Sequence, residues 1–268
     1  MIYHYCNVDA FHSIIETKQV WLTDITKLND RTEYKSGFDV ISGILKKKGL
    51  SDRPELQEIT TEKLNSTLLI LAGCFSKEGD SGSQWGLYGD DSKGLSIGFD
   101  EIEIAQLDMF NGYTNNGFQP ITSFVALREV NYDRSDFSSR VSDFIDEMKE
   151  KSPILKYKLL AIGLRRLAAI YKDPYFKDER EVRAVLEIEH GSDDLHTLEV
   201  RVNAFQEKAI YHKLLTSYED CSAIKEVIIG ANCHLTKEDV ARSLHERGLE
   251  KVSVRDSSGR GRYRTASK

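Results

Sequence analysis

The chain has 268 residues, of which 40% are hydrophobic and 30% charged, and its formal net charge is −6. This composition is typical of a soluble globular protein with a sizeable core, and the acidic balance argues against a surface that binds nucleic acid throughout. The N-terminus lacks the features of a secretory signal and no window approaches eighteen uninterrupted apolar residues, so we expect a cytoplasmic protein without membrane contact.

Helices and strands alternate in the predicted first half of the chain. Asn7 can cap a short helix over VDAFHSIIETK, after which QVWLTD has the pattern of a strand. Two amphipathic helices are expected over residues 33–48 and 54–68, because a glycine follows the first and a proline opens the second. The other predicted strands of this half are LLILAGCFS, LSIGFD and ITSFVALREVNY.

The second half begins with a long helical stretch and then returns to strands. Residues 135–172 have a helical pattern that is interrupted at Pro153, and the part after Pro153 is apolar on most sides, as in a buried helix. A helix is also expected over residues 237–247, among strands predicted at EVRAVLEI, HTLEVRV, KAIYHKLL, KEVIIG and KVSVRD. No composition shift or long linker divides the chain, so we predict one α+β domain over residues 1–268.

Cysteine and histidine spacing gives no sign of a metal site. The four cysteines, at positions 6, 74, 221 and 233, lack paired C-x-x-C spacing and are too sparse for a disulfide framework. His4, Cys6, Cys233 and His234 are residue types that suit zinc, but their spacings are not those of structural zinc sites. We therefore expect reduced thiols and no metal.

A charged run, FKDEREVRAV over residues 176–185, precedes an apolar strand-like segment. In an extended strand Glu179, Glu181 and Arg183, together with Lys177, would lie on one face because residues two apart share a side. One interpretation is a solvated face with weak ion pairs. The other is a pair of carboxylates presented at a strand entrance beside a cleft.

Two aromatic segments are further candidates. His4 lies in the strand-like run IYHY, where a histidine is more often a structural residue than a ligand contact. Trp85 and Tyr88 are three residues apart and would share a face in a helix, an arrangement more common in cores than in binding sites. The glycines and acids around them, in GDSGSQWGLYGDDSKG, favour a loop that contacts a ligand.

The blocks of this sequence resemble, in order, those of a bacterial family, domain-of-unknown-function family 2971. The blocks are IYHYCNVDAFHSIIETKQVWLTDITKLNDRTEY, GCFS, QWGLYGDDSKGLSIGFD, FKDEREVRAV and KEVIIG. Each is weak alone, but the ordered set is specific and spans most of the chain. Arg31 departs from the family, which commonly has proline after LND, and the helical section 134–173 has no counterpart among these blocks.

That family is similar to the ADP-ribosyltransferase superfamily, which implies a split, bent mixed sheet with additional helices. The resemblance makes Glu181 the catalytic glutamate and Glu179 the first glutamate of a paired E-x-E arrangement. It implies that His4 contacts the nicotinamide-side ribose, that Ser76 closes the cleft, and that Tyr88, or else Trp85, stacks on nicotinamide. The residues it places at the NAD cofactor are His4, Tyr5, Asn29, Ser76, Trp85, Tyr88 and Arg183.

The implied function is an NAD-dependent ADP-ribosyltransferase or NAD glycohydrolase, suited to a bacterial toxin or phage-defence effector. The acceptor stays open between a protein, a nucleic acid and water, as does the oligomeric state. The alternatives are an inactive nucleotide- or protein-binding module with the same fold, and another hydrolase that uses the carboxylate pair. The mapping predicts that His4, Tyr88 and Glu181 line one cleft, and that Glu181→Gln abolishes NAD consumption with little loss of stability.

Overall fold

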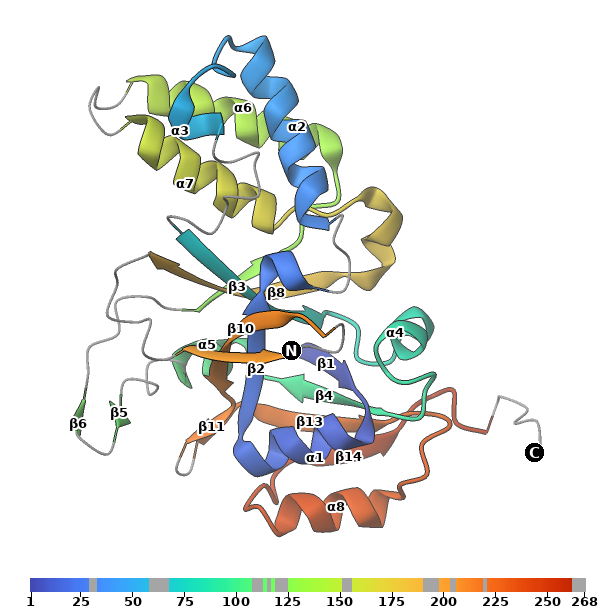
Figure 1. Ribbon diagram of the computed structural model, residues 1–268. Helices are drawn as coiled ribbons and strands as arrows, with labels where there is room; N and C mark the ends of the chain where they lie inside the picture. The colour runs from blue at the N-terminus through green and yellow to red at the C-terminus, as the bar shows by residue number, and fades with distance from the viewer. Residues whose placement is uncertain are drawn as a thin grey trace.

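Ten strands of the described residues form one mixed sheet at the centre of the computed structural model (Figure 1). The structure describes residues 1–28, 33–57, 68–107, 113–114, 117–118, 125–150, 156–189, 198–202, 206–218 and 221–261. The strands of the sheet are β1 (Ile2–Cys6), β2 (Gln19–Asp24), β3 (Leu68–Ser76), β4 (Leu95–Phe99), β7 (Ala126–Glu129), β8 (Glu181–Glu189), β9 (Leu198–Val202), β10 (Lys208–Leu215), β13 (Ile224–Ile229) and β14 (Ser253–Asp256). Short pairs are formed by β5 (Tyr113–Thr114) with β6 (Gly117–Phe118), and by β11 (Ser217–Tyr218) with β12 (Cys221–Ser222).

The sheet branches at β3, a strand with three neighbours. Along one edge β3 pairs with β8 over its whole length, from Leu68 to Ser76. Along the other edge it pairs with β1 only at Ser76 and with β2 only at Leu71 and Ala72. From there the strand order is β1-β4-β13-β14 on one side and β2-β10-β9 on the other, while β7 extends β8. Strands β13 and β14 are parallel and the other pairs antiparallel, so the sheet is mixed.

Helices lie at two ends of the molecule (Figure 1). One layer consists of α2 (Glu33–Lys47), α3 (Pro54–Gln57), α6 (Arg134–Glu150) and α7 (Lys156–Ala169), which contact one another. At the opposite end lie α1 (Val8–Thr17) and α8 (Lys237–His245). The remaining helices are α4 (Gly82–Leu87), α5 (Glu101–Leu107) and the 3-10 turns η1 (Ile25–Lys27) and η4 (Pro174–Glu179). With the mixed sheet, this confirms the α+β class.

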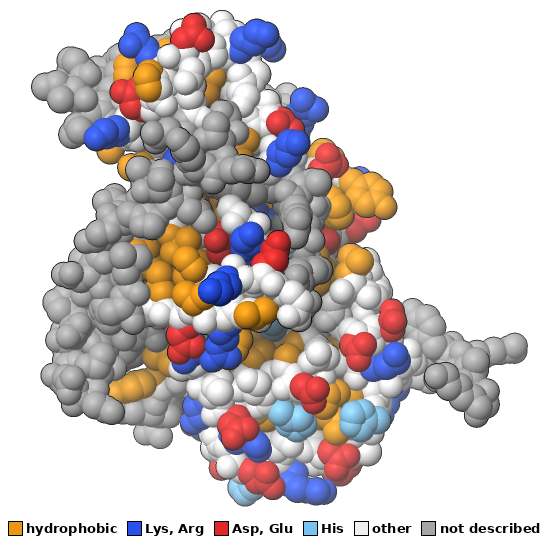
Figure 2. Space-filling model, viewed as in Figure 1, with side chains coloured by type: hydrophobic (Ala, Val, Ile, Leu, Met, Phe, Trp, Pro, Cys, Tyr) orange, Lys and Arg blue, Asp and Glu red, His pale blue; other side chains and the backbone are white. Residues whose placement is uncertain are grey.

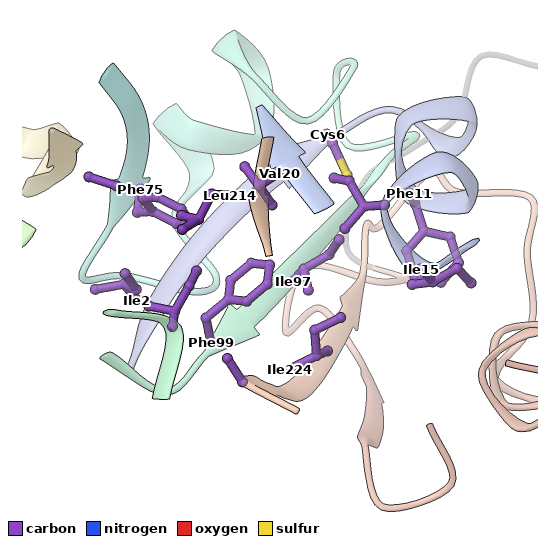
Figure 3. Packing of buried hydrophobic residues seen from close by; sticks show 14 of the residues in the cluster. Ile2, Cys6, Phe11, Ile15, Val20, Phe75, Ile97, Phe99, Leu214 and Ile224 are labelled. Atoms are coloured by element: carbon purple, nitrogen blue, oxygen red, sulfur yellow. The ribbon is translucent and has the colours of Figure 1, made fainter. Parts of the chain in front are cut away.

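Two hydrophobic cores lie on opposite faces of β3 and β8, because side chains alternate along a strand. Leu69 and Leu71 belong to the core that the branches of the sheet share with α1 and α8, whereas Leu68 and Ile70 face α2, α6 and α7. Figure 3 shows part of the first core, where Phe99 lies among side chains from several strands. We call the first the lower core and the second the helical core.

Most predicted elements agree with the structure. Asn7 caps α1 as expected, since its side chain accepts a hydrogen bond from the backbone nitrogen of Ala10 at 2.8 Å. The helix predicted over 33–48 ends at Lys47, and the stretch 135–172 forms α6 and α7. The helix predicted over 54–68 begins as α3, and its residues 58–67 lie outside the described part. Of the strand predicted over ITSFVALREVNY, β7 forms ALRE, residues 130–132 are not strand, and residues 121–124 lie outside the described part.

The surface that Figure 2 shows has acidic and basic side chains interspersed. In the described part of this face, no broad patch carries basic side chains alone, in keeping with the net charge of −6. Among the described residues, no helix combines the length and the apolar character needed to cross a membrane.

Candidate functional site

A buried group of charged side chains lies where β8 begins. Glu179 ends η4, Glu181 opens β8, and Arg183 follows two residues later; the first two are 5% exposed and Arg183 is fully buried. The fourth member is Lys172, which is 2% exposed and follows α7. We call these four residues, Lys172, Glu179, Glu181 and Arg183, the charge cluster.

Lys172 joins the two carboxylates. Its Nζ donates to Oε2 of Glu179 and, at 3.0 Å, to Oε2 of Glu181. Arg183 donates from Nε to Oε1 of Glu181 at 2.7 Å, and from a terminal nitrogen to the carbonyl oxygen of Ala169 at 2.6 Å. Buried charges are costly unless they are paired in this way. The two carboxylates and two cations therefore compensate one another inside the protein.

The backbone that brings the carboxylates together is not the extended row that the sequence predicts. Pro174 starts η4, and the Asp173 side chain accepts from the backbone nitrogen of Tyr175 at 2.9 Å, so this stretch turns helically. Arg180 then adopts the left-handed conformation, with φ of 46°, and the strand starts after it. The prediction that Glu179 continues the strand face of Glu181 is wrong, yet the turn still places both at Lys172.

Burial raises the pKa of Glu181, but the charges of Arg183 and Lys172 outweigh burial and hold the pKa at about 2, compared with an ordinary 4.5. A carboxyl group whose pKa is lowered by folding stabilises the fold at any pH above its unfolded pKa. That contribution is lost as the pH falls through the folded value. Glu181 is therefore an anion at every physiological pH, despite its burial.

This lowered pKa predicts an acid-sensitive stability. As the pH falls from about 5 to about 2, the free energy of unfolding should drop by about 3 kcal/mol more in the wild type than in Glu181→Gln. Urea titrations at several pH values measure it. As a control, Asp9→Asn removes an exposed carboxyl group and should leave the wild-type slope unchanged. If the free energy of unfolding falls equally with pH in wild type and in Glu181→Gln, the lowered pKa of Glu181 is contradicted.

Two tyrosines border the charge cluster. Tyr88 is 37% exposed, and its hydroxyl donates to Oε1 of Glu179 at 3.3 Å. The hydroxyl of Tyr132 accepts from the backbone nitrogen of Glu181 at 3.0 Å. Burial raises the pKa of both phenols, so both stay protonated. Tyr88, more exposed than any member of the cluster, connects it to the surface.

Ser76, the last residue of β3, is hydrogen-bonded to the backbone beside the charge cluster. Its hydroxyl donates to the carbonyl oxygen of Glu179 at 2.7 Å and accepts from the backbone nitrogen of Glu78 at 3.1 Å. Ser76 is 2% exposed and pairs with Glu181 across the sheet. It is thus close to the charge cluster, where it fixes the backbone; its predicted role of closing a ligand cleft stays a prediction.

Trp85 and Tyr5 lie apart from the charge cluster. Trp85 is 4% exposed, and its indole nitrogen donates to Oδ1 of Asp80 at 2.7 Å. The ring of Tyr5 meets the Trp85 ring edge-on at 4.8 Å, and its hydroxyl donates to the carbonyl oxygen of Glu78 at 2.7 Å. Helix α4 ends before Tyr88, so Trp85 and Tyr88 do not share the predicted helical face. Trp85 and Tyr5 belong to a small core that holds the loop.

His4 lies on the opposite face of the sheet from Glu181. Tyr3 pairs with Ser76, and Ser76 with Glu181, so these three share one face and His4 has the other. The His4 ring packs 5.8 Å from Phe75 of the lower core. The prediction that His4 lines one cleft with Tyr88 and Glu181 is therefore wrong for His4.

The role of His4 in the fold is structural. Its Nδ1 lies 3.2 Å from the carbonyl oxygen of Cys74, which falls between the parts of β3 that pair with β1 and β2. The ring thus provides a polar partner where the sheet branches. Burial lowers the pKa of His4, which favours the neutral ring. Asn29, the other residue predicted near the first strands, lies outside the described residues.

Asp80 ties the loop before α4 to a distant part of the chain. Besides Trp85, its Oδ1 accepts from the hydroxyl of Ser257 at 2.6 Å, and its Oδ2 accepts from the backbone nitrogen of Ser258 at 2.7 Å. Burial raises the pKa of Asp80, but these hydrogen bonds outweigh burial and lower it overall. The loop that carries Tyr88 is therefore also anchored, through Asp80, to residues 257 and 258.

Lys172 and Tyr132 were not among the residues predicted for the site. Backbone bonds between Asn131 and residues 170 and 172 bring their segments together, with the Lys172 nitrogen 3.1 Å from the Asn131 carbonyl oxygen. Lys172 follows an apolar helix and precedes Asp-Pro, the one local sign that this lysine is not on an exposed helix face. Among the described residues, no three His, Cys, Asp or Glu side chains are grouped as a metal ion requires.

Comparison with known proteins gives one match. No curated protein and no solved structure matches the chain. A family model covers the segment from α4 to the middle of β8, which includes Tyr88 and the whole charge cluster. Over residues 84–184 the chain matches the family described as protein of unknown function (DUF2971), which confirms the family resemblance for this segment.

Proposed function

We propose that the protein cleaves the bond between nicotinamide and ribose in NAD, and transfers ADP-ribose to an acceptor or to water. The observation that carries the proposal is Glu181, a carboxylate kept ionised while 5% exposed, close to the half-exposed Tyr88. Strongly shifted pKa values are common at catalytic sites, although structural ion networks shift pKa values as well. The substrate comes from the resemblance to ADP-ribosyltransferases alone, and the contact that this resemblance implies for His4 is contradicted by the strand pairing.

The chemistry needs an anion at the place where positive charge develops. When the bond breaks, nicotinamide leaves with the electron pair and the ribose carbon acquires oxocarbenium character, as in glycoside cleavage. A fixed carboxylate that faces this carbon stabilises the transition state more than the ground state. Arg183 and Lys172 keep Glu181 in the required ionised form.

Glu179 is close enough to Glu181 to take part in the same reaction. Both carboxylates accept from the same Lys172 Nζ, so their bonded oxygens are separated by at most two hydrogen-bond lengths, about 6 Å. In the proposed reaction Glu181 faces the ribose carbon, and Glu179 accepts the proton of the attacking acceptor.

The direct test is nicotinamide release from NAD by the purified chain, followed by chromatography. Release that depends on the folded protein supports cleavage, and labelled ADP-ribose on an added protein or nucleic acid would identify transfer. Such an activity suits a cytoplasmic toxin or phage-defence effector, as the family resemblance implies. The absence of release with each acceptor class would contradict the proposal.

Replacing Tyr88 separates a binding role from a packing role. Tyr88→Ala should weaken NAD binding by about 1–3 kcal/mol, because the ring provides a stacking surface for nicotinamide. The melting temperature should change little, since Tyr88 is 37% exposed. Tyr88→Phe keeps the ring, removes the hydrogen bond to Glu179, and should retain most of the affinity. Calorimetric titration with NAD measures both, and a large loss of melting temperature would indicate a packing role.

One observation favours a second candidate, a nucleotide- or protein-binding module without catalysis. The charge cluster contains two carboxylates and two cations that satisfy one another, as in a purely structural ion network. A thermal-shift titration with NAD, nicotinamide and ADP-ribose distinguishes the candidates. Stabilisation by NAD or ADP-ribose together with no release of nicotinamide would favour the binding module.

A further inference from the structure

An open depression lies next to the charge cluster. It has a volume of about 480 Å³, lies between α2 and η4, and is lined by Lys35, Ser36, Asp39, Asp173, Tyr175 and Phe176. One wall is shared with the charge cluster, because Nζ of Lys172 lies over the Phe176 ring, 4.9 Å from its centre.

We infer that this depression binds the adenosine half of the dinucleotide, with the base stacked on Tyr175. The inference rests on the proposed function, which supplies a dinucleotide whose other half lies at Tyr88 and the charge cluster. It adds a subsite whose six lining residues are not among the site residues that the sequence predicts.

Tyr175 is the feature that points to an aromatic ligand. It is 84% exposed, the largest exposed fraction among the large hydrophobic residues described. It is also held in place, because its backbone nitrogen donates to Asp173 and its ring meets Phe176 edge-on at 5.1 Å. A fixed ring that leaves its face to water gains stability when a nucleobase covers it.

The polar residues of the depression match the rest of an adenosine monophosphate. Lys35 and Asp39 are one helical turn apart and therefore lie on the same side of α2. Lys35 makes no ion pair with any described residue, and its ammonium group can bind a phosphate. Carboxylates only accept hydrogen bonds, so Asp39 and Asp173 suit ribose hydroxyls and the amino group of adenine.

The charges also limit the ligand. Two carboxylates and one ammonium group leave the depression with one excess negative charge, which disfavours a triphosphate. The same excess charge opposes a phosphate anywhere but at Lys35, the one cation among the lining residues, so the phosphate of the ligand must lie there.

Titration of AMP into the full chain by isothermal calorimetry tests the subsite without any catalysis. Tyr175→Ala should weaken AMP binding about tenfold or more, whereas Tyr175→Phe should stay within about twofold of the wild type. Lys35→Ala should weaken AMP more than adenosine, because only AMP carries the phosphate. Ile102→Ala, a control at a residue that is 69% exposed on α5, should change nothing. These variants should fold, since Tyr175 and Lys35 are exposed.

The outcomes separate the subsite from the proposed reaction. AMP binding that is absent, or equal in wild type and Tyr175→Ala, overturns the subsite even where nicotinamide is released from NAD. AMP binding that follows the expected order supports the subsite even where no nicotinamide is released, and then only the proposed cleavage fails. Where release occurs, Tyr175→Ala should raise KM for NAD and leave kcat unchanged; a fall in kcat at unchanged KM would also overturn the subsite.

Discussion

Glu181→Gln should reduce the rate of nicotinamide release at least about 100-fold. Removing one fixed electrostatic group from an enclosed site commonly costs two to three orders of magnitude, and glutamine keeps the size of the side chain while removing its charge. The developing ribosyl cation would then face a neutral amide. Release is measured by chromatography at equal concentrations of folded protein.

Matched folded concentrations are essential, because the buried ion pairs of Glu181 lead us to expect a larger loss of stability than the sequence alone suggests. Arg183 and Lys172 are buried and both bind Glu181. Without its charge these cations are only partly compensated, which costs on the order of 3 kcal/mol. A circular dichroism melt of each preparation shows the folded fraction. Nicotinamide release that persists in folded Glu181→Gln would exclude the catalytic role.

Two further variants define the comparison. Glu179→Gln should be milder for hydrolysis, and where an acceptor is modified it should impair transfer more than hydrolysis, since accepting the nucleophile's proton is a separate task. Glu199→Gln is the control, because Glu199 is 39% exposed, pairs with Lys213 and Arg201, and lies on β9. Its activity should equal that of the wild type.

Lys172→Met should destabilise the fold by about 3–5 kcal/mol. Methionine fills a similar volume, but it leaves Glu179 without its cation and Glu181 with only Arg183, and breaking a buried ion pair on one side has a cost of this size. Urea unfolding measures the change. The difference in unfolding free energy between wild type and Lys172→Met should become smaller as the pH falls. Protonation then removes the charge of a buried carboxylate that has lost its cation.

Lys213→Met provides the matched control for this prediction. Lys213 also pairs with a glutamate, but its side chain is 34% exposed and that of Glu199 is 39% exposed. Exposed ion pairs contribute about 0–1 kcal/mol, so the control should stay within 1 kcal/mol of the wild type. Equal losses in the two lysine variants would show that Lys172 does not stabilise a buried pair.

Local structure was predictable wherever a short pattern determines it. The strand at LLILAGCFS, the capped helix after Asn7 and the two helices of the middle section follow from apolar runs and capping residues, which act over a few positions. Helix α5 was missed, because seven residues give too few turns for a periodic signal.

The composition of the site was only partly predictable, because it depends on which strands pair and in which register. A shift of one residue moves a side chain to the other face of a sheet, and the pairing of Tyr3 with Ser76 is what places His4 away from Glu181. Lys172 reaches the carboxylates through the contact between residues 131 and 172, a pairing that no local pattern encodes. The carboxylates themselves were identified by their E-x-E spacing.

The hydrogen bonds of Asp80 have a consequence for the order in which a growing chain matures. Asp80 and Tyr88 leave the ribosome early, yet the partner hydroxyl of Ser257 is synthesised 177 residues later. Until then the loop of Tyr88 lacks the hydrogen bonds that Asp80 accepts from Ser257 and Ser258, although β3 and β8 have already been synthesised. The proposed activity, which needs Tyr88 held in place, would therefore begin only after nearly all of these residues have been translated.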